Sequence, residues 1–80
     1  MHVIKPAVRQ KIHDHGLSVE EVEAVLGAPE QTVPGYGGRL VHQSRTGRYL
    51  VRVVVETDRD PLEVVTAYRT SNVQKYWQVE

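Results

Sequence analysis

The sequence predicts an α+β domain: two N-terminal helices, then an antiparallel β-meander of three to four strands, then a short C-terminal helix. Two valine-rich runs, residues 51–55 and 64–71, indicate paired strands because β-branched side chains favour extended backbone. Helical spacing of apolar residues and a capping sequence within the first 30 positions predict the helices. The 80 residues suffice for a single domain, 1–80, with one small core.

The two N-terminal helices are predicted from apolar spacing and from residues typical of helix ends. Residues 5–15 form the first, because apolar side chains recur every four positions and Pro6 fits a first turn. The second begins at Ser18, whose hydroxyl can form a capping box with the Glu21 carboxylate, and ends at residues 27–29, Gly-Ala-Pro. Its expected buried stripe consists of Val19, Val22, Val25 and Leu26.

Residues 39–45 and 49–56 predict a hairpin whose register depends on the length of its turn. With a three-residue turn, His42 lies opposite Arg52. With a two-residue turn, we expect Val41 in that place and His42 on the other face. The turn therefore decides which side chains share a face with Arg52.

A second hairpin follows, and its turn at residues 57–61 is rich in polar residues and ends in proline. A turn centred near Arg59 would place Arg52 beside Thr66 and Leu50 beside Tyr68. The opposite face, lined by Tyr49, Val51, Val53 and Val55, is the one expected to meet the helices. We therefore expect Arg52 to be partly exposed on the face away from the first two helices, with the valines buried.

Two shorter segments complete the expected fold. Residues 31–38 contain one proline and three glycines and predict a loop or a short edge strand. The last helix is expected to begin at Thr70 or Ser71, with residues 71–74 as a second capping box. Its apolar side consists of Val73, Tyr76 and Trp77, of which Tyr76 and Trp77 are expected to be core.

Composition excludes several functional classes. The chain has no cysteine, so a disulfide framework and a thiolate metal site are both excluded. No apolar run approaches the roughly 18 residues of a membrane helix, and the N-terminus lacks the features of a signal peptide. A soluble, cytoplasmic protein without membrane contact is the expectation.

Formal net charge is zero, but the charges are segregated along the chain. Residues 18–30 carry only acidic charges, whereas residues 31–52 carry only basic ones, namely Arg39, Arg45, Arg48 and Arg52. Clustered arginines on a hairpin indicate a basic face suited to phosphate contact.

Several segments together resemble a known family: residues 15–18 (His-Gly-Leu-Ser), residues 20–22 (Glu-Glu-Val), residues 65–69 (Val-Thr-Ala-Tyr-Arg) and residues 75–77 (Lys-Tyr-Trp). The pattern is similar to the RelE-like superfamily of bacterial toxins, in particular BrnT-type toxins and an allied family of uncharacterised domains, over nearly the whole chain. The resemblance implies a RelE/barnase-like ribonuclease fold, metal-independent cleavage of mRNA, including mRNA at the ribosome, and no cofactor. It also implies an antitoxin protein that covers the active face; a homodimer is a further expected assembly.

The first helix departs from the family because it lacks a histidine that related domains often carry there. Related domains often carry a histidine and an arginine there; the corresponding places are Lys5 and Arg9, or Ala7 and Lys11, depending on alignment. The resemblance thus retains Arg9 as an additional candidate. His15 is the other additional candidate, because it matches the histidine of a BrnT-like Lys-His-Gly pattern in which Asp14 replaces the lysine.

RNA cleavage without a metal requires a base, an acid and cations against the charge that develops at phosphorus. Histidine suits both proton roles because its unperturbed pKa is about 6.5. The expected catalytic residues are His42, Arg52, Thr66 and Tyr68, and the expected phosphate-binding residues are Arg45, Arg48 and Arg69. His13 and His15 point about 200 degrees apart on a helix, so a shared metal site is not expected. The alternative is a non-catalytic module of the same fold that docks a protein or nucleic acid.

Overall fold

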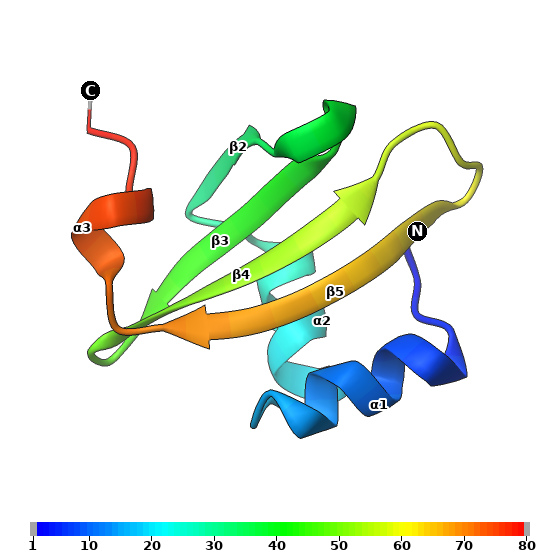
Figure 1. Cartoon of the computed structure of the whole chain (residues 1–80), viewed down its shortest axis with the longest axis horizontal. Coiled ribbons are helices and arrows are strands. Elements are labelled where there is room, and N and C mark those ends of the chain that lie inside the picture. The colour runs from blue at the N-terminus through cyan, green and yellow to red at the C-terminus, as the bar shows by residue number, and fades with distance from the viewer. Residues whose placement is uncertain (1, 80) are drawn as a thin grey trace.

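A five-stranded sheet separates two helices on one face from a short helix on the other (Figure 1). The computed structural model describes residues 2–79. Its elements are β1 (His2–Val3), α1 (Pro6–Asp14), α2 (Val19–Gly27), β2 (Gln31–Pro34), the 3₁₀ turn η1 (Tyr36–Gly38), β3 (Leu40–Thr46), β4 (Tyr49–Glu56), β5 (Leu62–Thr70) and α3 (Val73–Tyr76). The strand order is β1-β5-β4-β3-β2.

The predicted α+β class and order of helices are confirmed, but the sheet has five strands and is mixed rather than antiparallel. The difference is β1, which pairs in parallel with β5. A strand of two residues has no alternation from which it could be predicted. The edge strand expected within residues 31–38 is β2, which pairs antiparallel to β3.

The main core lies between α1, α2 and the sheet. Ile12 is the fully buried residue of α1. Of the four residues expected to be buried on α2, only Val22 and Val25 are buried. The remaining core residues come from the loop before α2 and from β4 and β5: Leu17, Val51, Val53, Val55, Val64 and Ala67. Because side chains alternate along a strand, burial of the β4 valines turns Arg52 to the opposite face, where it is half-buried as predicted.

The capping box at the start of α2 is confirmed. The Glu21 amide donates to Ser18 Oγ at 3.1 Å, and the Ser18 amide donates to Glu21 Oε1 at 3.0 Å. Two of the amides that a helix start leaves without partners are thereby satisfied.

Replacing Ser18 by alanine is expected to lower the free energy of unfolding by about 1 kcal/mol, because the Glu21 amide loses its acceptor. Urea unfolding followed by circular dichroism measures the loss. Ser18→Thr keeps a hydroxyl and serves as the control, with a smaller expected loss. Equal losses in both variants would show that the hydroxyl is not what stabilises this helix start.

The β3–β4 hairpin has a two-residue turn, with Thr46 opposite Tyr49. Gly47 has a φ of 60° and is the only positive-φ residue of the turn, the pattern of a type II′ turn. The residue opposite Arg52 is therefore Gln43, and the expectation of His42 or Val41 in that place is wrong. His42 lies opposite Val53 and so faces the helix side of the sheet.

The β4–β5 register also differs from the prediction. Arg52 lies opposite Tyr68 rather than Thr66, and Leu50 lies opposite Thr70 rather than Tyr68. The loop is centred between Arg59 and Asp60, because Glu56 pairs with Glu63, and this shifts the pairing by one residue. A β-bulge between Val54 and Val55 shifts it by one more. Both effects depend on loop and bulge geometry, which alternation alone does not reveal.

The C-terminal helix α3 is a single turn that packs against the sheet face opposite α1 and α2. Its N-cap is Asn72, whose side chain makes no capping bond, so the expected capping box at residues 71–74 is wrong. Thr70 Oγ1 instead accepts from the Asn72 amide at 3.0 Å. Tyr76 and Trp77 are half-buried rather than core, and the ring of each lies against an arginine, Arg52 and Arg45 respectively.

Candidate functional site

Four polar residues, one from each of four adjacent strands, form a line across the sheet face that carries α3. Gln31 lies opposite Gln43, Gln43 opposite Arg52, and Arg52 opposite Tyr68. Each is hydrogen-bonded to the next: Gln43 Nε2 donates to Gln31 Oε1 (2.8 Å), Arg52 Nε to Gln43 Oε1 (2.9 Å), and Arg52 to the Tyr68 hydroxyl (2.6 Å). We call these residues the polar row.

The guanidinium of Arg52 is held on several sides. Its Cζ lies 4.1 Å from the centre of the Tyr76 ring and 5.8 Å from that of Tyr68. A guanidinium has five N–H donors, and beyond the two bonds to the polar row the other three have no hydrogen-bond partner among the described residues. Arg52 is therefore a cation of fixed orientation with donors to spare.

Arg52 and Tyr68 line a groove of about 380 Å³ on this face. Its full lining is Pro34, Gly35, Tyr36, Arg39, Val41, Arg52, Val54, Thr66, Tyr68 and Tyr76. Tyr36 is 95 % exposed at the rim, on η1, where the positive φ of Gly37 and Gly38 turns the chain. The groove thus combines two arginines with aromatic rings, the residue types that bind phosphates and stacked bases.

Ion pairs moderate the charge of two nearby arginines. Arg39 Nε lies 2.9 Å from Glu56 Oε2, and the bond from Arg39 lowers the pKa of Glu56 below its usual range. Arg45, beyond the groove on the same face, pairs with Glu30 at 3.3 Å and lies over the ring of Trp77. Arg52, in contrast, has no carboxylate partner within salt-bridge distance in the described part of the chain.

The structure brings together three of the four predicted catalytic residues, Arg52, Thr66 and Tyr68, in the groove. The fourth, His42, lies on the other face of the sheet, where its Nδ1 is 2.8 Å from Thr32 Oγ1. Its ring meets that of His2 edge-on at 5.9 Å. His42 therefore cannot act on the same phosphate as Arg52, and their expected proximity is wrong.

Burial lowers the pKa of His42, and the positive charge of His2 lowers it further. Burial also lowers the pKa of His2, whose Nε2 is buried without a hydrogen-bond partner among the described residues. Both rings are consequently favoured in the neutral form. Because burial disfavours the charged form of both rings, this pair of His2 on β1 and His42 on β3 is sensitive to acid.

Acidification below pH 6.5 is expected to reduce the free energy of unfolding through this pair. Because the folded-state pKa values lie below the ordinary 6.5, the unfolded chain binds protons first, and the stability contribution is lost as pH falls from 6.5 through the lowered values. Urea unfolding at pH 7.5 and pH 5 measures it. His42→Phe should make the free energy of unfolding less dependent on pH in this range. Glu56 does not interfere, because its lowered pKa affects stability only below its ordinary pKa of 4.5. An unchanged profile in His42→Phe would contradict the assignment.

The remaining predicted residues have other surroundings. Arg48 is exposed in the β3–β4 turn. On the helix side, Arg69 lies over the ring of Tyr49, and a Cβ at Gly16 would come within 3.3 Å of Arg69 Nη2. His15 Nδ1 is 2.7 Å from the carbonyl oxygen of Ala67, so that nitrogen is the donor. Arg69 and His15 are thus separated from the groove by the sheet.

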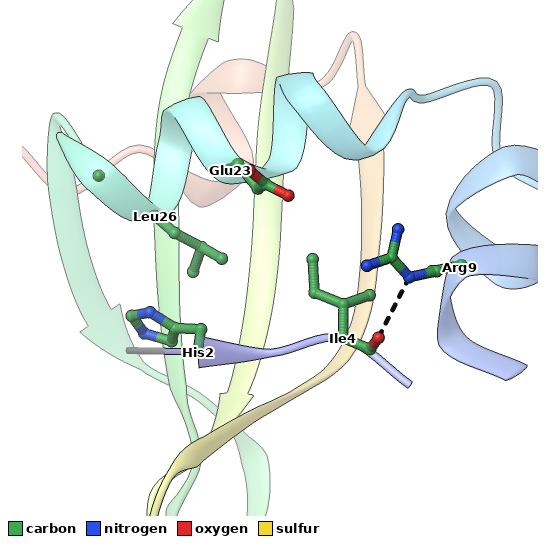
Figure 2. Close-up of a pocket in the computed structure, with 6 residues that line it drawn as sticks. His2, Ile4, Arg9, Glu23 and Leu26 are labelled. Carbon is green, nitrogen blue, oxygen red and sulfur yellow. Dashed lines mark hydrogen bonds between the residues drawn. The ribbon is translucent and has the colours of Figure 1, made fainter. Parts of the chain in front are cut away.

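Arg9 lines a second pocket, of about 470 Å³, between β1, α1 and α2. Figure 2 shows its Nε bonded to the Ile4 carbonyl oxygen at 3.3 Å, with Glu23 also bordering the pocket. Arg9 is therefore not part of the groove that contains Arg52.

The sequence interpretation missed the two glutamines of the polar row. Gln43 occupies a position that alternation assigns to the same face as Val41, where a valine would be expected if burial alone mattered. A polar residue at such a position is the signal that could have indicated a buried hydrogen-bond network.

Between residues 2 and 79, no cluster of three or more histidine or acidic side chains is placed to hold a metal ion. Over the same residues, no helix has the length and apolar character needed to cross a membrane. The chain matches no protein-family model, and comparisons with curated proteins and with solved structures found no match.

Proposed function

We propose that this domain is a toxin-like endoribonuclease that binds single-stranded RNA in the groove and cleaves it without a metal ion. The observation that carries the proposal is the 2.6 Å contact between Arg52 and the Tyr68 hydroxyl in the groove. A fixed guanidinium beside a hydroxyl is suited to a phosphodiester, because one neutralises charge and the other transfers a proton.

Binding would use the arginines for phosphate and the tyrosines for bases. Three N–H donors of Arg52 are bonded to no residue between positions 2 and 79, and Arg39 lies in the same groove. The exposed ring of Tyr36 offers a stacking surface, which favours unpaired bases over a duplex. Single-stranded RNA, such as mRNA, is therefore the proposed ligand.

In the proposed reaction, the ribose 2′-oxygen attacks phosphorus and the bond from phosphorus to the 5′-oxygen breaks. The products are a 2′,3′-cyclic phosphate and a 5′-hydroxyl. Arg52 stabilises the extra negative charge at phosphorus, and Tyr68, whose oxygen accepts from Arg52, gives its own proton to the departing oxygen. The 2′-hydroxyl proton passes to water, because no histidine lines the groove.

The second candidate is a non-catalytic module that binds RNA or a protein partner on the same face. Two observations favour it: the formal net charge is zero, and none of the four histidines lines the groove. If the protein binds RNA but does not cleave it, this second function is the correct one. An antitoxin covering the groove is part of the first proposal.

Salt dependence tests RNA binding. If Arg45, Arg48 and Arg52 each neutralise one phosphate, a plot of log affinity against log salt should have a slope of about −2, from roughly 0.7 per contact on single strands. Arg52→Ala should weaken binding and make the slope shallower by about 0.7. Titration of fluorescent RNA measures both quantities, with Lys11→Ala on α1 as the control. A flat dependence would remove the RNA proposal in both its forms.

A further inference from the structure

We infer that Gln43 is the positioning residue of the groove, which orients the Arg52 guanidinium and joins it to the C-terminal segment, residues 73–78. The inference concerns the same site and rests on the proposed function. Gln43 touches no proposed ligand, since it is not among the residues that line the groove. Its effect would pass entirely through Arg52 and Tyr76.

The first observation is that Gln43 is a fully buried polar side chain, with an exposed fraction of 0 %. Burying an amide is costly unless its hydrogen bonds are made. Its Oε1 accepts from Arg52, and its Nε2 donates to Gln31 Oε1 and, at 3.1 Å, to the Tyr76 carbonyl oxygen. Both of its donor hydrogens and its acceptor oxygen are therefore used.

The second observation is the direction of these bonds. An amide has one accepting and one donating end, so two donor bonds at Nε2 oblige Oε1 to face Arg52. Bonds to Gln43 and Tyr68 then hold the guanidinium at two different nitrogens, which fixes its plane. The guanidinium carbon lies over the Tyr76 ring, 4.1 Å from its centre. Arg52 would thus meet a phosphate without first losing side-chain freedom.

The third observation is that the polar row also holds the main chain of the C-terminal segment. Besides the bond from Gln43 to Tyr76, Gln31 Nε2 donates to the Gln78 carbonyl oxygen at 2.7 Å and Gln31 Oε1 accepts from the Gln78 amide at 3.1 Å. These bonds place the Tyr76 ring beneath Arg52. The two glutamines therefore set one wall of the groove as well as the orientation of its cation.

Gln43→Met tests the inference, because methionine has nearly the same length but makes none of these bonds. We expect the kcat of RNA cleavage to fall by about 10²-fold, with a smaller change in KM. In the RNA-free protein, the Arg52 Nε–H resonance should lose its protection from solvent exchange in nuclear magnetic resonance spectra. Gln43→Glu keeps the acceptor and should retain that protection, while its negative charge weakens RNA binding.

Leu50→Ala is the matched control for lost stability. Leu50 is fully buried on the same face but does not line the groove, so the variant should be destabilised yet retain the Arg52 resonance while folded. If Gln43→Met leaves both the resonance and kcat unchanged, Gln43 is not a positioning residue. If the wild type neither binds nor cleaves RNA, the proposed function fails, whereas the resonance still decides whether Gln43 orients Arg52.

Discussion

Tyr68→Phe is expected to lower the rate of RNA cleavage by about 10²-fold or more, with RNA affinity nearly intact. The substitution removes the hydroxyl that would protonate the departing 5′-oxygen and that accepts from Arg52 at 2.6 Å. The ring remains, so stacking on a base is preserved. Single-turnover cleavage of end-labelled RNA, with detection of the cyclic phosphate product, measures the rate.

The matched control is His42→Ala. The sequence favoured His42 as acid or base, but its place on the helix side of the sheet predicts cleavage at the wild-type rate. If His42→Ala instead lowers the rate of RNA cleavage by about 10²-fold and Tyr68→Phe leaves it unchanged, His42 is the catalytic acid or base and the groove is not the reaction site.

Ile12→Ala is expected to have the largest effect on stability, a loss of about 3 kcal/mol, because it deletes the fully buried side chain of α1 and leaves a cavity. A domain of 80 residues has a total free energy of unfolding of only about 4–12 kcal/mol. The melting temperature should fall by about 12 °C or more. Thermal and urea unfolding followed by circular dichroism measure both quantities.

Val8→Ala provides the comparison on the same helix. Val8 is half-buried at the edge of the core, and its truncation should cost about 1 kcal/mol, as expected for less apolar area lost. Equal losses in the two variants would mean that α1 is not anchored through Ile12.

The sequence was sufficient to predict elements that follow from local chemistry. The capping box at Ser18 and the burial of Val51, Val53 and Val55 depend on neighbouring residues and on alternation, and both are confirmed. The prediction also placed Arg52 and Tyr68 on one face, although it paired Arg52 with Thr66, two residues away from its observed partner Tyr68. The RelE/barnase-like fold and the toxin function stay predictions.

The sequence could not predict which residues from different strands meet. The partner of Arg52 depends on whether the β3–β4 turn has two residues or three, and either length is compatible with residues 46–48. The same choice moved His42 to the helix side. Alternation marks Gln43 as an unusual polar residue, but it could not show its three partners, which lie on two other strands and in α3.

The β-bulge in β5 allows residues three positions apart to face the same side of the sheet, which the alternation of a regular strand does not permit. Val64 and Ala67 both face the helices although three positions apart, while Thr66 and Tyr68 face the groove. Val65 is the extra residue that makes this spacing possible. If the same residues paired without a bulge, strict alternation would turn either Val64 or Ala67 toward the groove. The bulge thus lets this strand serve both a dry interior and a wet surface despite its extra residue.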